Sequence, residues 1–284
     1  NKAIAVTVDS SANYCKSFPL IGGKQIVCEN WRNLISVGAS PIAITNCLNF
    51  GNPENKEVMG EFVECLQGIK EACEFLDYPV VSGNVSFYNG TNKKNIFPTP
   101  VIGGVGLISD ISKTLNHHFK KENNIIILIG KTFGHIEQSC FLKENFSITE
   151  GLPPEVNLKN EKNNGEAVLK LIKKDLIMSA HDVSNGGLLV SLCEMSIGSN
   201  LGAKILKPKK LRNMFEYFFG EDQGRYIIEI DKKNLDQVMK ILDEDKIYYE
   251  NIGKTQKKYF EVVGELNINI NDLFKINNTW YNNY

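Results

Sequence analysis

The strongest constraint on the fold is an alternation of apolar strands and amphipathic helices over the first 112 residues. Ala3 to Val8 is typical of a buried strand, and apolar residues then recur at helical spacing between Val27 and Ile35. The unit repeats, with a short strand at 42–45 and a long amphipathic helix at 58–76. A short polar motif follows, and a glycine-laced strand at 101–108 closes the region. The pattern predicts one α/β unit over residues 1–112.

The second region is separated from the first by a polar stretch. Residues 114–124 carry lysines and paired histidines, which is typical of a linker, so we place the boundary between 112 and 113. Beyond it, strands are predicted at 125–129, 203–206, 226–230 and 259–263, and helices at 168–172, 187–195 and 235–242. The sequence therefore predicts an α+β domain with a C-terminal tail over residues 113–284.

Size and charge exclude several function classes. A chain of 284 residues favours two packed domains, and 42% hydrophobic residues supply ample core material. A formal net charge of -1 gives no overall field that attracts nucleic acid or anionic lipid. No apolar run approaches the roughly 20 residues that span a bilayer. We therefore expect no nucleic-acid or membrane partner, and small-molecule chemistry is favoured.

The cysteines indicate the compartment. There are seven of them, an odd number, with no C-x-x-C spacing, and several fall on predicted buried helix faces. This usage is typical of a reducing environment and predicts a cytoplasmic location. No signal peptide opens the chain. The first residue is Asn1, directly before the first strand, so we expect the natural protein to extend upstream.

The motif Ser82-Gly83-Asn84-Val85-Ser86 is the first candidate for ligand binding. A glycine lets the backbone approach a ligand, and adjoining amides can point at phosphate oxygens. The side-chain oxygen of Asn84 suits Mg²⁺, and Ser86 lies two residues later, on the same side of an extended chain. On the residues alone an ordinary turn is the simpler interpretation, because glycine and asparagine are frequent turn residues.

The second candidate is the segment 179–187, a strand end that opens onto a helix. Free backbone amides and the helix dipole attract anions at such a place, so His181 and Asp182 are candidate ligand contacts. The alternative is structural, with Asp182 or Ser184 as the helix N-cap and His181 as a hydrogen-bonded buried side chain.

Two further positions carry polar groups at the ends of strands. The segment 219–225 places Glu221 and Gln223 just before a strand, although a solvated loop is the simpler interpretation. Asp9 ends the first strand, where α/β proteins often keep ligand-binding groups. Neither position is informative by itself.

Several long runs resemble phosphoribosylformylglycinamidine synthase. The resemblance extends over essentially the whole chain and is carried by residues 47–62, 79–89, 98–106, 134–139, 179–188 and 278–280. The family is built from two homologous halves, and this chain resembles the C-terminal half of its short form. The resemblance implies a fold like that of aminoimidazole ribonucleotide synthetase, with an N-terminal sheet subdomain that pairs into a barrel and a C-terminal α+β subdomain.

The resemblance also implies a reaction and partners. The family converts formylglycinamide ribonucleotide, ammonia and ATP into formylglycinamidine ribonucleotide, in purine biosynthesis. In the short form a separate glutaminase subunit supplies the ammonia, and a small accessory subunit joins them. The expected partners are thus the N-terminal half of the same enzyme, these two subunits and the substrate. Because the family's catalytic histidine lies in the other half, we expect no catalytic residue here and no activity of this part alone.

Carried over residue by residue, the resemblance implies a site for ATP and Mg²⁺. Asn46 and Gly83 correspond to ATP contacts, Asn84 to a Mg²⁺ ligand and Ser86 to a substrate contact. Asn46 stands where the family often has Asp, so a charge is lost there, and Glu137 replaces a usual Gly. An auxiliary, pseudo-symmetric nucleotide site would be formed by the counterparts of ligand-binding residues of the first half, namely Asp9, His181, Asp182, Glu221 and Gln223.

Two other hypotheses stay open. This half can be a non-catalytic scaffold that holds a structural nucleotide. It can also belong to a relative such as selenophosphate synthetase, but such relatives typically carry an Asp-Gly-Val-Gly-Thr-Lys loop where this chain has Asp9 followed by Ser-Ser-Ala-Asn-Tyr. Because the fold pairs two sheets, the isolated half should expose an apolar sheet face, and we expect it to form a homodimer.

Overall fold

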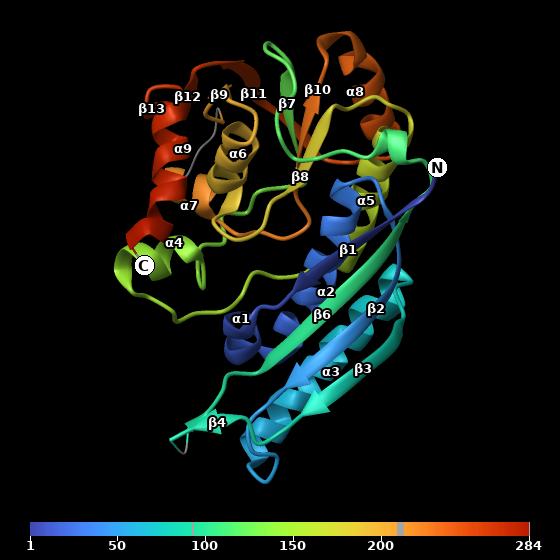
Figure 1. Ribbon diagram of the computed structural model, residues 1–284, viewed down its shortest axis with the longest axis vertical. Helices are drawn as coiled ribbons and strands as arrows, with labels where there is room; N and C mark the ends of the chain where they lie inside the picture. Colours follow the sequence, from blue (N-terminus) through green and yellow to red (C-terminus); the bar gives the residue numbers. More distant parts are fainter. Residues whose placement is uncertain (93, 209–212, 284) are drawn as a thin grey trace.

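The computed structural model describes residues 1–92, 94–208 and 213–283. It contains two regions stacked end to end, each built on its own sheet (Figure 1). The N-terminal region has a four-stranded sheet in the order β1-β6-β2-β3, and the C-terminal region has a seven-stranded sheet. Strands that the sequence predicts at 3–8, 125–129 and 226–230 are confirmed as β1 (Ala3–Asp9), β7 (Ile125–Ile129) and β10 (Tyr226–Ile230).

The N-terminal sheet is mixed. Strand β6 (Thr99–Ile108) pairs antiparallel with β1 and with β2 (Ser40–Asn49), and β2 pairs parallel with β3 (Val80–Ser86). Three helices, α1 (Ala12–Ser17), α2 (Pro19–Ser36) and α3 (Lys56–Leu76), follow β1 and β2. A small hairpin, β4 (Gly90–Thr91) with β5 (Lys94–Asn95), extends beyond the sheet.

Helices α2 and α3 cross in close backbone contact. A Cβ atom added at Gly68 would meet the carbonyl oxygen of Leu20 at 2.1 Å, and one added at Gly23 would meet that of Cys65 at 2.3 Å. Side chains at either glycine would therefore force the helices apart. Local signals fix the ends of α3, because the Asn55 side chain accepts a hydrogen bond from the Glu57 amide and Asp77 takes the left-handed conformation.

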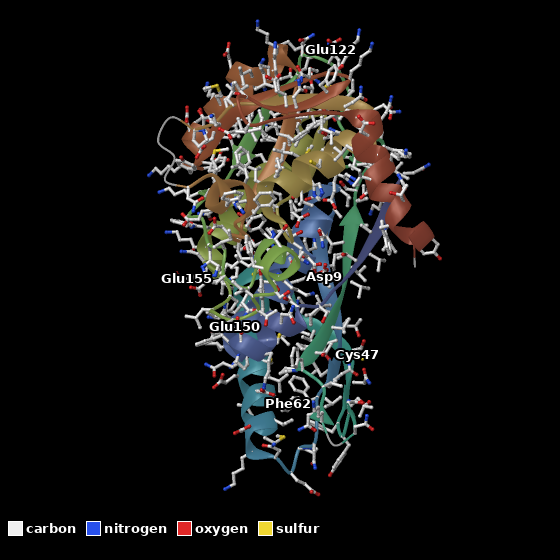
Figure 2. All side chains as sticks on the ribbon, turned by 90° about the vertical axis from the view of Figure 1, so that its left-hand side faces the viewer. Asp9, Cys47, Phe62, Glu122, Glu150 and Glu155 are labelled. Carbon is white, nitrogen blue, oxygen red and sulfur yellow. The ribbon has the colours of Figure 1, made fainter. Side chains whose placement is uncertain are left out.

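Only one face of the N-terminal sheet is covered. The alternate residues of β1 that point away from the helices, Ile4, Val6 and Val8, are 71%, 69% and 66% exposed. Ile42 and Val105 on the neighbouring strands are exposed as well. In Figure 2, Cys47 lies on the outer side of the sheet and Phe62 on the side of α3. This open apolar face agrees with the expectation from the sequence, and the described strands form no closed barrel.

The C-terminal sheet has the order β13-β12-β9-β11-β7-β10-β8 and is covered on both faces. Ile127 and Ile129 of β7 face the core formed with α5 (Leu158–Lys173) and α8 (Leu235–Glu244). Ile126 and Leu128 face the other core, formed with α6 (Gly187–Ile197), α7 (Met214–Phe219) and α9 (Ile270–Thr279). The first core continues into the N-terminal region through α2, so the two regions share apolar contacts. The boundary between 112 and 113 stays a prediction.

Several elements differ from the sequence-based prediction. The segment 82–86 is part of strand β3 and not a turn. Strand β11 (Tyr249–Lys257) was not predicted, because its sequence is polar and lacks clear alternation. The segment 114–124 has no helix or strand, as predicted for a linker, yet Phe119 within it is buried and the Glu229 carboxylate accepts the backbone N–H groups of Lys120 and Lys121.

The remaining elements are short or lie at the edges. The strands are β8 (Ser179–Asp182), β9 (Leu201–Ile205), β12 (Tyr259–Val262) and β13 (Leu266–Asn269). Helix α4 (Cys140–Phe146) and the 3-10 turns η1 (Ile111–Lys113), η2 (Lys232–Asn234) and η3 (Trp280–Asn283) complete the chain. Among the residues described, no helix is both long and apolar enough to cross a membrane.

Candidate functional site

A stripe of polar side chains crosses the open face of the N-terminal sheet on β2 and β3. The parallel register aligns Thr45 with Ser82, Cys47 with Asn84, and Asn49 with Ser86. Because side chains two residues apart share a face, these six residues point to the same side. We call them the polar stripe. The Thr45 and Ser82 hydroxyl oxygens lie 2.8 Å apart, and Asn84 is exposed.

The stripe borders a shallow pocket. Its volume is about 380 Å³, and it is lined by Val8, Thr45, Asn46, Cys47, Ser82, Gly83, Asn84, Val101 and Gly103. Hydroxyl and carboxamide groups therefore lie beside apolar residues of β1 and β6. Such a surface can bind a ligand that has both a polar and an apolar part.

Asn46 and Gly83 are paired in register but lie on the other side of these strands from Asn84 and Ser86. A Cβ atom added at Gly83 would meet the Asn46 Oδ1 atom at 1.9 Å, so the Asn46 side chain already fills the space that a larger residue would need. A larger residue at position 83 would therefore displace the Asn46 side chain. Strand alternation divides the four predicted residues, and only Asn84 and Ser86 present side chains on the open face.

Ser86 is held by Asn89. The Asn89 side-chain amide donates to the Ser86 carbonyl at 2.9 Å and reaches the Ser86 hydroxyl oxygen at 3.1 Å. It also donates to the Phe50 carbonyl at 3.1 Å, which ties the end of β3 to the end of β2. This role of Asn89 was not predicted from the sequence, because it depends on contacts across the turn that follows β3.

The stripe suits Mg²⁺ only as part of a larger ligand set. The Asn84 carboxamide and the serine hydroxyls are oxygen donors of the kind that Mg²⁺ prefers. In the part of the chain that the structure describes, no group of three or more His, Cys, Asp or Glu side chains is arranged to hold a metal ion. The residues thus fit a cation that takes its other ligands from phosphate oxygens, water or another polypeptide.

Of the other five predicted residues, Gln223 and Asp182 contact Arg32, whereas Asp9, His181 and Glu221 are held by other groups nearby in the fold. The fully buried Arg32 guanidinium donates to Glu161 at 2.8 Å and to Gln223 at 3.0 Å. Its Nε atom lies 3.8 Å from the Asp182 carboxylate. Burial lowers the pKa of Arg32, but the charges of Glu161 and Asp182 outweigh that effect and hold the pKa above its ordinary value. Arg32 is therefore a permanent internal cation.

Asp9 accepts hydrogen bonds from α2, the helix that also carries Arg32. Asn30 and Asn33 of α2 each donate to its carboxylate at 2.8 Å, and the Thr7 hydroxyl lies 3.2 Å away. Burial raises the pKa of Asp9, and the hydrogen bonds from Asn30 and Thr7 oppose that rise. Asp9 is thus fixed by the protein itself.

His181 connects Asp182 to helix α6. Its ring nitrogens lie 3.3 Å from the Asp182 carboxylate and 3.0 Å from that of Glu194. Burial opposes protonation, but the hydrogen bonds to Asp182 and Glu194 raise the pKa of His181 to about 9. The imidazole is therefore charged at neutral pH. Helix α6 has Gly186 as its N-cap, so the interpretation of Asp182 or Ser184 as the cap is wrong.

Glu221 joins three segments. Its carboxylate accepts the Tyr14 hydroxyl at 2.5 Å and the backbone N–H groups of Cys140 and Gly186 at 2.8 Å each. Glu221 is 1% exposed, and Asp222 and Arg225 are also buried. The segment 219–225 is therefore no solvated loop, because its charges are compensated by backbone N–H groups and carbonyls in the interior.

Sequence reasoning missed Arg32 and Glu161, which organise this network. The available signal was an arginine beside Cys28, Trp31 and Ile35 on an otherwise apolar helix face. A charged residue in such a place is almost never buried unless it is paired. Its partners lie far away in sequence, so the pattern alone does not identify them.

Comparison with known families and proteins finds relatives along the whole chain. The AIR synthase related protein family matches with its N-terminal domain over residues 1–108 and with its C-terminal domain over residues 121–264. The phosphoribosylformylglycinamidine synthase subunit PurL of Pelagibacter ubique is 55% identical over 284 residues, covering 100% of this chain and 39% of that protein. The PurL of Bradyrhizobium diazoefficiens is 44% identical over 283 residues, covering 100% and 38%. The chain thus spans about two fifths of the length of these curated relatives.

Solved structures confirm the predicted fold. T. maritima PurL complexed with FGAR superposes with a TM-score of 0.79 at 16% identity, covering 96% of this chain and 46% of that one. A thiamine-monophosphate kinase from Stenotrophomonas maltophilia superposes with a TM-score of 0.67 at 16% identity, covering 90% of this chain and 84% of that one. At such identities the likeness shows the shared fold alone.

Proposed function

We propose that this chain, which belongs to the AIR synthase related protein family, forms one half of a phosphoribosylformylglycinamidine synthase. The reaction is the ATP-dependent conversion of formylglycinamide ribonucleotide and ammonia into formylglycinamidine ribonucleotide. The observation that carries the proposal is the identity of 55% to a synthase subunit along the entire chain. The exposed polar stripe beside an open apolar face supports it, because such a surface suits a site completed by another part of the enzyme.

In this proposal the polar stripe positions Mg²⁺ and the substrate, and residues on the other side of β2 and β3 contribute to ATP binding. Asn84 holds the cation through its carboxamide oxygen, and the cation neutralises charge on the ATP phosphates when it is bound. Ser86 donates a hydrogen bond to formylglycinamide ribonucleotide, with its hydroxyl oriented by Asn89. Gly83 and Asn46 contact ATP near the outer edge of β3, where an edge strand leaves backbone groups unpaired by the sheet.

The chain contributes binding and orientation, not proton transfer. We place the catalytic acid or base in the N-terminal half of the enzyme, so this chain alone is inactive. The open face, with Ile4, Val6 and Val8 exposed, supports docking of that half. A glutaminase subunit and a small accessory subunit complete the assembly. The isolated chain forms a homodimer through the same face. The seven cysteines, all unpaired, favour a cytoplasmic location.

The second candidate is a scaffold role, in which Asp9, His181, Asp182, Glu221 and Gln223 border an auxiliary nucleotide site without turnover. The Arg32 network favours the scaffold part of this role, because these side chains already have protein partners and hold the fold together. A calorimetric titration with Mg-ADP tests the auxiliary site. Saturable heat that disappears in Asp182→Asn supports it, and no heat at millimolar ligand removes it.

Reconstitution tests the main proposal. The chain alone should show no ammonia-dependent synthase activity, and adding the remainder of the enzyme should restore it. For substitutions in the stripe such as Asn84→Ala, Asn267→Ala is a matched control that should leave the reconstituted activity unchanged. This exposed asparagine lies on β13, far from the stripe in the fold. If the chain alone turns over at the full rate, the proposal of a shared site is wrong.

A further inference from the structure

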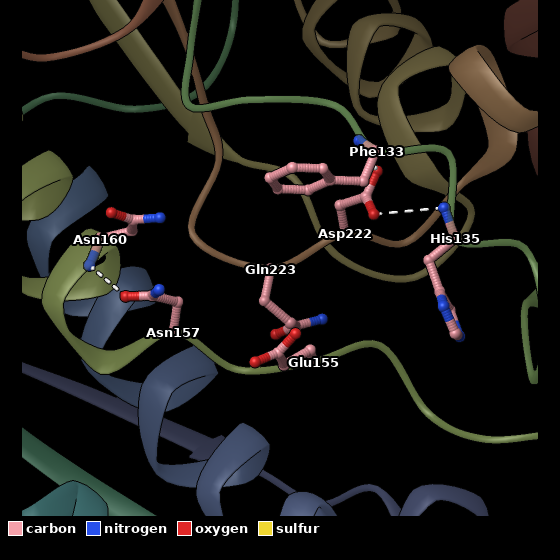
Figure 3. A pocket seen from close by; sticks show the side chains of 7 residues that line it. All are labelled: Phe133, His135, Glu155, Asn157, Asn160, Asp222 and Gln223. Carbon is pink, nitrogen blue, oxygen red and sulfur yellow. Dashed lines mark hydrogen bonds between the residues drawn. The ribbon is translucent and has the colours of Figure 1, made fainter. Parts of the chain in front are cut away.

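A recess in the C-terminal region is separate from the polar stripe. Its volume is about 330 Å³, and it is lined by Phe133, His135, Glu155, Asn157, Asn160, Asp222 and Gln223 (Figure 3). These residues come from the loop after β7, the approach and first turn of α5, and the loop before β10. Three segments that are distant in sequence thus converge on one space large enough for a small organic molecule.

The Phe133 ring is exposed, and its backbone is held by a hydrogen bond. Phe133 is 77% exposed, and its backbone N–H donates to the Asp222 carboxylate at 2.9 Å. The same carboxylate accepts the N–H groups of Gly134 at 2.8 Å and His135 at 3.2 Å. A buried carboxylate therefore fixes the loop that carries an exposed aromatic ring. Figure 3 shows this ring at the edge of the recess, above Gln223 and Glu155.

Two carboxamide side chains around the ring are also held in place. The Gln223 carbonyl oxygen accepts from Arg32 at 3.0 Å, and its amide nitrogen donates to the Glu221 carbonyl at 2.9 Å. The Asn157 side chain caps α5 by accepting from the Asn160 backbone N–H at 3.0 Å. Preorganised groups lose little freedom on binding, which favours a specific ligand.

The charge of the lining selects the class of ligand. None of the described residues that line the recess is a lysine or an arginine, and Glu155 and Asp222 carry negative charge. The lining itself therefore offers no cationic side chain that could pair with a phosphate or a carboxylate, because Arg32 reaches the recess only through its hydrogen bond to Gln223. A ligand with N–H donors is favoured, because the Glu155 carboxylate and the carboxamide oxygens accept hydrogen bonds.

We propose that this recess binds an uncharged purine nucleoside, with its base stacked on Phe133 and its N–H edge donating to Glu155. The Gln223 amide, fixed by Arg32 and the Glu221 backbone, donates its second N–H to a ring nitrogen of the base. Stacking on an aromatic ring needs only a π face, whereas the acidic lining requires a base with N–H groups and no phosphate nearby. This site does not depend on the proposed synthase activity, which uses the open face of the other sheet.

Titration with nucleosides tests the site. Adenosine and inosine should each bind saturably at millimolar or lower concentration, measured by calorimetry or by ligand-observed NMR. Phe133→Ala should weaken binding roughly 5- to 100-fold, the range expected for loss of one base–aromatic stack. Phe133→Tyr should retain binding, because it keeps the ring. Glu155→Gln should also weaken binding, because it removes the charged acceptor.

Matched controls keep the test decisive. Phe215→Ala removes another exposed ring, 55% exposed and stacked on Phe141, and should leave nucleoside binding unchanged. AMP should bind more weakly than adenosine, since the lining is acidic. The proposal is overturned if neither nucleoside binds saturably, if Phe133→Ala binds like the unaltered protein, or if the binding that Phe133→Ala removes is tighter for AMP than for adenosine. Equal thermal melting of Phe133→Ala and the unaltered protein shows that any loss of binding is not due to unfolding.

Discussion

The polar stripe and the Arg32 network contain similar chemical groups in opposite settings. Asn84 in the stripe is exposed on a sheet face that no described element covers. In the network, Arg32, Glu161 and Asp182 are buried, and both carboxylates lie beside the Arg32 guanidinium. Buried charges must be paired to be tolerated, so the network is primarily part of the fold. The stripe faces outward, and its groups are available for a ligand.

Arg32→Met should have the largest effect, because it tests whether the buried network stabilises the fold. It leaves Glu161 and Asp182 as buried carboxylates without their cation, and breaking such a network costs about 3–5 kcal/mol. Urea denaturation should show this loss of unfolding free energy. Lys113→Met breaks a surface ion pair with Asp175 at 2.8 Å and serves as the control, with an expected cost below about 1 kcal/mol. Equal costs for the two variants would mean that the buried network is not structural.

The pH dependence of stability should report the same network. The folded-state pKa of His181 is raised to about 9 from an ordinary value of 6.5. The folded protein therefore holds this proton more tightly than the unfolded chain does, and the resulting stabilisation is complete below pH 6.5 and is lost as pH rises through about 9. We expect a decrease on the order of 3 kcal/mol across this window.

His181→Gln is the variant that checks this assignment, with denaturation midpoints compared at both ends of the window. It should flatten the pH dependence of the denaturation midpoint. An undiminished slope in His181→Gln would assign the titration to another group.

A smaller effect is expected at Asn89, which orients Ser86 in the stripe. Asn89→Ala removes hydrogen bonds to the Ser86 hydroxyl and carbonyl, each worth about 0.5–1.5 kcal/mol. In the reconstituted enzyme the KM for formylglycinamide ribonucleotide should rise several-fold, with little change in the KM for ATP. A double variant with Ser86→Ala should then show no additional increase. Additive effects would mean that Asn89 does not act through Ser86.

The sequence predicted the elements better than their arrangement. Strand β10 was predicted with its observed bounds. Its sequence is an apolar run interrupted only by Glu229, and charged residues, Arg225 and Asp231, flank the run. Strand β11 was missed, because polar residues such as Lys254 and Gln256 break any apolar alternation in its sequence. The strand is held by its pairing with β7 on one side and β9 on the other. Long-range pairing, not local pattern, fixes that strand.

The candidate site shows the same limit. The motif around Asn84 was found by its resemblance to a family, but whether it was a turn or a strand was left open. Its pairing with β2 shows that Gly83 serves packing against Asn46, while Asn84 and Ser86 face outward. Arg32 escaped prediction, because its partners Glu161 and Gln223 follow it by more than a hundred residues.

The most direct test of the account compares Asn84→Ala and Ser86→Ala in the reconstituted synthase. If the stripe binds Mg-ATP at one residue and substrate at the other, Asn84→Ala should lower kcat/KM for Mg-ATP and Ser86→Ala should lower it for formylglycinamide ribonucleotide. Losing a hydrogen bond or ligand to a charged group costs about 1.5–3 kcal/mol, or roughly 10- to 150-fold. Reconstituted enzymes that are unchanged by both substitutions would contradict the account and leave the scaffold role in its place.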